Sequence, residues 1–339
     1  MAQQMKLFLI RHGETVDNVA QVYAGSRDSA LTNHGYQQAT RLGLHLSSLG
    51  LSFTHLFSSP LQRAAKTAGL IREAQLTPAS DGSPRTAPDI VQLPVLMEQD
   101  FGFYEGKKWY ERPVDGKSSG KEYHRQSHKD TEGFVDIESK ESLARRADAF
   151  LNRYLLPLLH SSEQPTDLEV AVVSHGIMLS TLWKRLLARL PERSVDLSPE
   201  LAATTLVSLE HLGAWSNTGY LEVHLLRIAL PRPTSLTTIP AIASTATALE
   251  SDVASSTPAP VSGIQATSEE HAGTSLQIPA PITEAVPLKL GPDWSLTIHT
   301  INGKDHLKGL KRTGGGVGSS RYDASQKNID SFFKRRKVD

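Results

Sequence analysis

The feature that most constrains the fold is an alternation of buried-strand and helical patterns over residues 6–227. Leu7–Ile10 and Val170–Val173 are continuous apolar runs, as expected for strands buried on both faces. Between them, apolar residues recur at helical spacing after Thr32, a candidate N-cap, until Gly50. This pattern predicts an α/β fold with an open, mostly parallel sheet and helices on both faces.

Weaker patterns suggest further elements in the same region. His55–Phe57 resembles a short strand, and Ser59 followed by Pro60 resembles a cap and first helical position. A helix is expected over Ser142–Leu159, and another from Ile177. These elements extend the predicted catalytic domain over residues 1–230.

The composition changes beyond that domain. Residues 231–290 are rich in Pro, Ala, Ser and Thr, so we predict a disordered insertion. Residues 291–312 then contain a partly alternating segment, Ser295–Ile301, which could pair with Tyr220–Leu226 and complete the first domain. The alternative is a linker followed by an independent fragment. Residues 313–339 are predicted to form a flexible tail.

Composition excludes several classes of function. Lys plus Arg and Asp plus Glu number 36 each, so net charge supplies no argument for direct nucleic-acid or membrane binding. The absence of cysteine excludes disulfides, thiolate metal sites and cysteine nucleophiles. The apolar run before Arg11 is too short for a signal peptide, so an intracellular protein is expected.

Two histidines follow the two clearest strands. Arg11-His12-Gly13-Glu14-Thr15 comes after the first, and Ser174-His175-Gly176 after the second. Because loops at the carboxyl ends of parallel strands converge on one crevice, we expect the two imidazoles to meet.

The accompanying residues suit phosphoryl transfer without a metal or cofactor. Arg11 and Arg63 offer planar forks that match a phosphate, and Asn18 offers an amide donor. His175, protonated when substrate is bound, would face the transferring group. His124 and His128 lie four residues apart, but without a supporting zinc motif they are interpreted as solvated.

A departing alkoxide also needs a proton, and a carboxylic acid can supply it. The candidates are Glu98, Asp100 and Glu105. Glu98 directly follows an apolar pair, where a strand would deliver it to the crevice, whereas Glu105 lies in a Gly-rich turn. Spacing leaves the choice open.

As an ordered set, these motifs resemble the histidine phosphatase (phosphoglycerate mutase-like) superfamily. The matching residues are Arg11-His12-Gly13-Glu14-Thr15 with Asn18, Gly25 before Leu31-Thr32, Ser58-Ser59-Pro60-Leu61 with Arg63 and Thr67, Leu96-Met97-Glu98 before Gly102 and Glu105-Gly106, and Ser174-His175-Gly176. The resemblance implies His12 as the phosphohistidine nucleophile and Glu98 as the acid. It implies a phosphate pocket formed by Arg11, Asn18, Gly25, Arg63 and His175.

A finer resemblance concerns the last strands. Asn217-Thr218-Gly219, Asn302 and His306-Leu307 look like the corresponding segments of the TIGAR-like sugar-bisphosphatase branch. Ala24 departs from that branch, which often carries a polar side chain there, so its substrate does not transfer directly.

The expected function is therefore a metal-independent, histidine acid phosphatase-type phosphomonoester hydrolase acting on a sugar phosphate or bisphosphate. Lys107–Ile137 is short and is expected to form a compact flap, which favours hydrolysis over mutase activity. The alternatives are a phosphoglycerate-type mutase and a non-catalytic adaptor.

The end of the tail predicts a second function. Gln326, Ile329, Phe332 and Phe333 closely resemble the box that docks proteins onto the replication sliding clamp, PCNA. One helical turn would gather the three apolar side chains into a plug. The basic run at residues 334–337 resembles a nuclear-import signal, so nuclear and cytoplasmic localisation is expected. The alternatives are chance occurrence of the pattern, packing of the tail on the domain, and a weak nucleic-acid contact.

Overall fold

The computed structural model describes residues 3–78, 85–108, 128–160, 167–204, 208–227 and 288–325. Nearly all of the predicted insertion at 231–290 lies outside these residues, as do His124 and the predicted clamp box at 326–333. The boundaries of the insertion therefore stay predictions.

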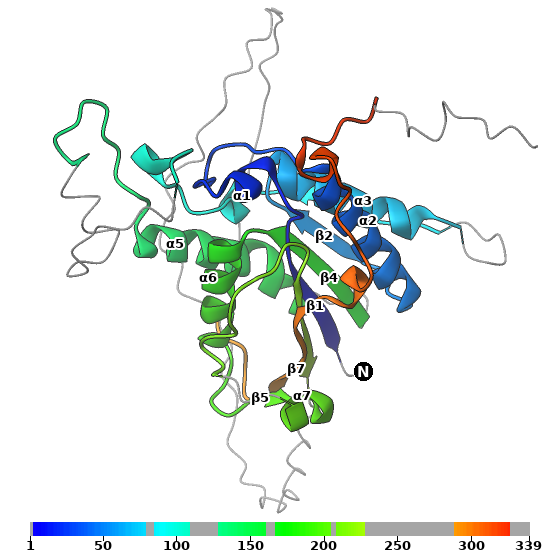
Figure 1. The fold of residues 1–339 in the computed structure, drawn as a ribbon. Helices are drawn as coiled ribbons and strands as arrows, with labels where there is room; N and C mark the ends of the chain where they lie inside the picture. The colour runs from blue at the N-terminus through cyan, green and yellow to red at the C-terminus, as the bar shows by residue number, and fades with distance from the viewer. Residues whose placement is uncertain are drawn as a thin grey trace, which may run out of the picture. The chain divides into compact units, whose positions relative to one another are not determined.

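The described residues form a seven-stranded mixed sheet with the order β3-β2-β4-β1-β6-β7-β5 (Figure 1). The strands are β1 (Gln4–Arg11), β2 (His55–Ser58), β3 (Ile90–Gln92), β4 (Asp167–Ser174), β5 (Val195–Leu197), β6 (Tyr220–Arg227) and β7 (Trp294–Gly303). β6 runs antiparallel to β1 and β7, and the other neighbouring strands pair in parallel. The predicted α/β architecture is confirmed.

Helices cover both faces of this sheet (Figure 1). α2 (Asn33–Ser48) and α3 (Gln62–Leu76) pack on one face, and α5 (Lys140–Phe150) and α6 (Gly176–Leu187) pack on the other. Two shorter helices are α1 (Val16–Ala20) and α7 (Pro199–Thr204). No helix among the described residues is long and apolar enough to cross a membrane.

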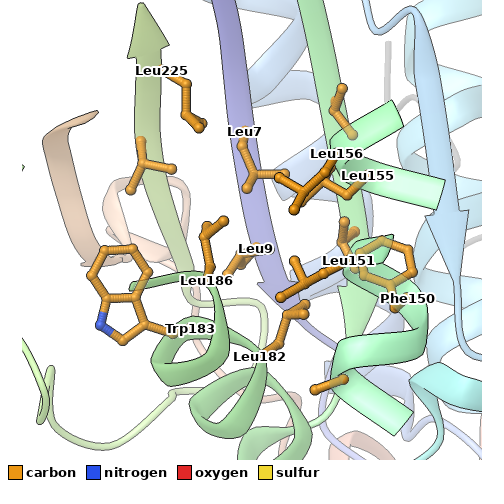
Figure 2. Close-up of a cluster of buried hydrophobic side chains, with 14 of the residues drawn as sticks. Leu7, Leu9, Phe150, Leu151, Leu155, Leu156, Leu182, Trp183, Leu186 and Leu225 are labelled. Atoms are coloured by element: carbon orange, nitrogen blue, oxygen red, sulfur yellow. The ribbon is translucent and has the colours of Figure 1, made fainter. Parts of the chain in front are cut away.

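Side chains of β1 alternate between two cores. Leu7 and Leu9 belong to the larger core, which α5, α6 and β6 complete (Figure 2). Phe8 and Ile10 point to the opposite face and pack with residues of α2 and α3. Burial of both faces explains why this strand has no polar alternation in its sequence.

Two helical predictions need adjustment. The helix expected to begin at Ser59-Pro60 begins at Gln62, and Ser59 Oγ accepts a hydrogen bond from Leu61 N at 3.3 Å instead of capping the helix. The helix expected over Ser142–Leu159 is regular only as α5. It continues as a π-helix over Leu151–Leu155 and a 3₁₀-helix over Leu156–Leu159.

The antiparallel pairing of β6 with β7 agrees with the expected pairing of these two segments. Val223 lies opposite Ile298, and Leu225 lies opposite Leu296. β7 therefore joins the sheet that carries β1 and extends the core formed by residues before 228.

The first part of the tail predicted from residue 313 makes specific contacts with the rest of the domain. Residues 312–322, here named the strap, pack against the beginning of α2. Asn33 N donates to Ser320 O at 3.0 Å, and the ring of Tyr322 stacks on Tyr36 with 3.7 Å between centroids. Hydrogen bonds and ring stacking hold this Gly/Ser-rich segment, although its composition gave no sign of them.

Candidate active site

His12 and His175 lie together because the strands that precede them are neighbours. β1 and β4 pair in parallel with Arg11 opposite Ser174, so the next residue of each strand enters the same crevice. The ring centroids lie 5.1 Å apart, and both side chains are buried. The expected meeting of the two imidazoles is confirmed.

The hydrogen bonds of His12 fix its tautomer. Its Nδ1 lies 2.7 Å from Gly13 O. Because a carbonyl oxygen only accepts, the proton of a neutral imidazole sits on Nδ1 and the lone pair sits on Nε2. Burial, assisted by the positive charges of Arg63 and Arg11, holds the pKa of His12 well below its usual value. A neutral, nucleophilic ring follows.

His175 has the opposite tautomer. Arg63 Nε donates to its Nδ1 at 3.2 Å, which leaves the proton of the neutral ring on Nε2. His175 Nε2 is buried and has no hydrogen-bond partner among the described residues. Burial, with Arg63 adding to it, lowers the pKa of His175 well below its usual value. A buried donor is thus left for a ligand.

Arg11 contributes a second unpaired donor. Its Nη1 donates to Trp215 O at 2.6 Å, whereas its Nε is buried without a partner in the described part of the chain. Leaving a buried donor unpaired costs about 1–3 kcal/mol, so such groups commonly mark a binding site. Two of them beside His12 suit an oxyanion.

Arg63 donates hydrogen bonds to more groups of the protein itself than the sequence suggested. Its Nη1 donates to Arg27 O at 2.8 Å, and its Nη2 donates to Ala24 O and Gly25 O at 3.2 and 2.8 Å. Arg63 therefore orients His175 and holds the loop at residues 24–27. Backbone carbonyls thus engage both terminal nitrogens of Arg63, and its role in binding phosphate stays a prediction.

Gly25 also has a different environment from the one expected. Both carboxylate oxygens of Glu105 accept from Gly25 N, at 3.0 and 3.1 Å, so this N–H is not free for a phosphate. A Cβ at Gly25 would lie 2.0 Å from Gln99 O. Gly25 is therefore required for close backbone approach, and Glu105 anchors its loop.

Asn18 lies in the short helix α1 after β1 and belongs to the site through Asn217. Its Oδ1 accepts from Thr15 N at 3.2 Å and from Asn217 Nδ2 at 3.1 Å. Asn217 Nδ2 also donates to His12 O at 3.3 Å. Any donation from Asn18 to a phosphate therefore falls to its Nδ2.

Glu98 reaches the site from a turn. A 3₁₀-helix, Pro94–Leu96, precedes it where the sequence analysis expected a strand. Its carboxylate accepts from Ile177 N and Met178 N, at 3.1 and 2.9 Å, at the beginning of α6. Its negative charge acts on the guanidinium groups of Arg11 and Arg63. Glu98 therefore lies near both arginines of the site.

A cavity of about 330 Å³ opens beside Glu98. It is lined by Ser26, Pro94, Met97, Glu98, Asp100, Asp136, Glu138 and Arg146. Of the site residues described above, Glu98 alone belongs to this lining.

Sequence reasoning missed Trp215 and Asn217 as parts of the site. Their contacts with Arg11 and His12 span 204 and 205 residues and involve backbone oxygens. No short motif records such contacts. Thr218, next to Asn217, has a φ of +55°. In the sequence, this segment was recognised only because Asn217-Thr218-Gly219 resembles a family segment.

The side chains assembled here can perform nucleophilic substitution at phosphorus. They provide an imidazole lone pair, two buried N–H donors and a nearby carboxylate. No group of three or more His, Cys, Asp or Glu side chains that could hold a metal occurs among the described residues. His128 is partly exposed, and its ring also packs against Phe103 with 5.3 Å between centroids.

The chain is similar to several known proteins. A probable phosphoglycerate mutase GpmB of Proteus mirabilis strain HI4320 is 31% identical over 193 residues, which cover 54% of this chain and 75% of the relative. One of Yersinia pestis strain Pestoides F is 33% identical over 187 residues with the same coverage. A mycobacterial glucosyl-3-phosphoglycerate phosphatase structure is 20% identical, with a TM-score of 0.45, covering 65% of this chain and 92% of that one.

The family model of the histidine phosphatase superfamily (branch 1) matches residues 7–218, which include His12, Glu98 and His175. The matched region is the larger part of the chain. The chain therefore belongs to the histidine phosphatase superfamily, branch 1, a group of phosphatases and phosphoglycerate mutase-like enzymes.

Proposed function

We propose that this protein hydrolyses a phosphomonoester through a phosphohistidine on His12. The observation that carries the proposal is the His12 Nε2 lone pair beside two buried donors, Arg11 Nε and His175 Nε2, that have no hydrogen-bond partner among the described residues. A phosphoryl group placed between them would be attacked by the imidazole while its oxygens accept both N–H groups.

In the first step, His12 Nε2 forms a bond to phosphorus and the ester P–O bond breaks. Glu98, in its acid form, gives its proton to the departing oxygen. In the second step, water attacks phosphorus and gives a proton to the Glu98 carboxylate. The P–N bond then breaks, which releases inorganic phosphate and restores neutral His12.

The phosphate dianion would change the charge state of His175. In the ligand-free site the pKa of His175 is low because of burial and nearby cations. A dianion within hydrogen-bond reach opposes both effects, since a neighbouring negative charge favours the protonated imidazole. We propose that His175 gains its proton together with the substrate and stabilises charge on the equatorial oxygens.

Mutase activity is the second candidate, because the bacterial relatives are named phosphoglycerate mutases. The two activities differ only in whether water or a second hydroxyl accepts the phosphoryl group. We favour hydrolysis on the shortness of the segment after Glu105, although residues 109–127 lie outside the described part of the chain.

The charge of the cavity beside Glu98 bears on the substrate class. Glu98, Asp100, Asp136 and Glu138 line it, and its one guanidinium, Arg146, is paired with Glu138 at 2.6 Å. A second phosphate there would meet like charge, which is unfavourable in a partly desolvated site. We therefore propose a sugar phosphate or other phosphomonoester with a neutral leaving group over a bisphosphate.

We also propose that residues 326–333 dock onto the sliding clamp and that the following basic run directs the protein to the nucleus as well as the cytoplasm. Support comes from the sequence pattern alone. Clamp pull-down should capture the full-length chain and lose it on Phe332→Ala/Phe333→Ala. Capture of the double variant at the parental level would refute docking through this box.

A direct assay separates the catalytic proposals from the adaptor alternative. Purified protein should release phosphate from p-nitrophenyl phosphate even in the presence of a chelator. The reason is that imidazole, guanidinium and amide groups, and not a metal, stabilise the negative charge of the phosphate. Incubation with a phosphoglycerate should yield free phosphate faster than the isomeric phosphoglycerate. Isomerisation without phosphate release would favour the mutase, and absence of both reactions would favour a non-catalytic adaptor.

A further inference from the structure

Glu14, two residues after His12, is the centre of a hydrogen-bond network that the mechanism above does not use. Its Oε1 accepts from Thr32 Oγ1 at 2.8 Å, and its backbone N donates to Gln38 Oε1 at 2.9 Å. Its backbone O accepts from Thr32 N at 3.0 Å. The side chain is only 12% exposed. Glu14 thus ties the nucleophile-bearing loop to the first turn of α2.

The strap contributes a further partner to this carboxylate. Arg312 Nη1 donates to Glu14 Oε1 at 2.8 Å, and Arg312 Nη2 donates to Glu14 Oε2. Two parallel N–H donors on two carboxylate oxygens form the bidentate arrangement that fixes orientation as well as distance. Arg312 Nη1 also donates to Ser319 Oγ at 2.9 Å, within the strap itself.

Other contacts hold the strap in place independently of this ion pair. Asn33 Nδ2 donates to Val317 O at 2.8 Å, and Tyr322 N donates to Leu31 O at 2.9 Å. The rings of Tyr322 and Tyr36 are nearly parallel, with 5° between their planes. Arg312 is therefore delivered to Glu14 by a segment anchored on both sides of the Thr32 cap.

Close packing allows little slack between Glu14 and His12. A Cβ at Gly35 would lie 2.0 Å from Glu14 O, and a Cβ at Gly13 would lie 2.6 Å from Gly35 O. Gly13 N is also bound by Thr67 Oγ1 at 3.1 Å. A displacement of Glu14 would consequently be transmitted through Gly13 to the imidazole rather than absorbed by empty space.

From these contacts we infer that Arg312 is a positioning residue for the nucleophile: through Glu14 it holds the loop that aims His12. The inference rests on the proposed phosphohistidine chemistry. It assigns the strap a role in catalysis although Arg312 lies 298 residues from Glu14 in the sequence. Arg312 touches neither imidazole in the described contacts and acts only through the loop.

The test compares Arg312→Ala with Lys311→Ala in the full-length protein. Lys311 is the exposed neighbour of Arg312 in the sequence and serves as the matched control. Small misplacement of reacting groups lowers the rate more than binding, so we expect kcat of Arg312→Ala to fall about tenfold, with KM changed less than about twofold. Single-turnover formation of phosphohistidine should slow by the same factor, and Lys311→Ala should match the parent.

Further variants separate positioning from folding. Glu14→Gln should lower kcat by a factor similar to that of Arg312→Ala, and the double variant should be no slower than the slower single variant. Arg312→Lys should restore part of the rate because one charged contact can reform. Melting curves recorded alongside should show folded protein for each variant.

The inference is overturned if Arg312→Ala turns over at the parental rate, or if its loss of rate is additive with that of Glu14→Gln. It is also overturned if the rate loss disappears once the fraction of folded protein is corrected for. Failure of the proposed function would look different, because the unsubstituted protein itself would then form no phosphohistidine.

Discussion

Arg63 Nε donates to His175 Nδ1 at 3.2 Å, and this single hydrogen bond decides where the proton of the His175 ring lies. With Nδ1 used as an acceptor, Nε2 carries the proton and faces the crevice without a protein partner among the described residues. The same guanidinium holds the loop at residues 24–27 by three carbonyl contacts. Arg63 is therefore a link between loop position and imidazole tautomer.

Replacing Arg63 by Lys should weaken both its hold on the loop at residues 24–27 and its hydrogen bond to His175, although the positive charge is retained. The lysine ammonium cannot donate hydrogen bonds to His175 and to the three carbonyl groups at once, so some of these buried acceptors lose their donor. We expect the free energy of unfolding to fall by about 2–4 kcal/mol and kcat to fall at least about 100-fold. Urea denaturation and steady-state kinetics measure the two effects. Arg72→Lys, on an exposed ion pair of the same helix, is the control, and equal behaviour of the two variants would contradict the assignment.

Glu98→Gln should affect slow leaving groups most. The amide cannot donate a carboxyl proton, so alkyl phosphates should lose about 100-fold or more in kcat. The loss should be smaller for p-nitrophenyl phosphate, whose leaving group departs without protonation. Asp100→Asn, which alters a carboxylate of the same cavity, should show no such dependence on the leaving group. A uniform loss across substrates would argue against general acid catalysis by Glu98.

The low pKa of His12 predicts that activity persists into acid. Attack requires the neutral imidazole, and burial together with Arg63 and Arg11 keeps the ring neutral at pH values below 6.5. The acidic limb of kcat/KM assigned to this ring should therefore lie well below pH 6.5. A pH–rate profile from pH 4 to 8 tests this. An acidic limb centred at an ordinary histidine value would show that the ring is not held neutral.

His306 should make the folded state sensitive to acid. Its Nε2 lies 2.9 Å from Thr218 Oγ1, while its Nδ1 is buried without a described partner. Burial lowers the pKa of His306 to about 4. Because the unfolded chain binds this proton near pH 6.5, stability should fall as the pH drops from about 6.5 to about 4.

The measurement is the free energy of unfolding of the parent and of His306→Gln across that pH range. The glutamine amide can still donate to Thr218 but does not titrate. The free energy of unfolding of His306→Gln should therefore depend less steeply on pH than that of the parent. Identical slopes for the two proteins would contradict the burial argument.

The parts of the site that the sequence predicted are those set by the strands. β1 and β4 were recognisable because both faces of each are buried, and their adjacency brings His12 and His175 together. The binding partners of Arg63 were not predictable, because a guanidinium fork suits a phosphate and a set of carbonyl groups equally well. Burial, which decides between these partners, follows only from the folded chain.

The strap shows a second limit. Residues 314–320 have the composition of a flexible joint, yet they contact α2, and Arg312 just before them binds Glu14; both partners lie far away in the sequence. Glu98 shows a third, since a 3₁₀-turn delivers it to a position where a strand was expected. Local sequence patterns predicted the identity of the residues at the site well. They predicted less accurately the secondary structure on which those residues lie.

The most direct test of the central claim is to trap the covalent intermediate. The enzyme is mixed with a ³²P-labelled phosphomonoester, and the reaction is stopped rapidly without acid. Peptide mapping should then place an acid-labile phosphoryl group on the peptide that contains His12. His12→Ala should carry no label and show no turnover, whereas His160→Ala should be labelled as the parent. Label on another residue, or a His12→Ala enzyme that hydrolyses substrate at the full rate, would contradict the account.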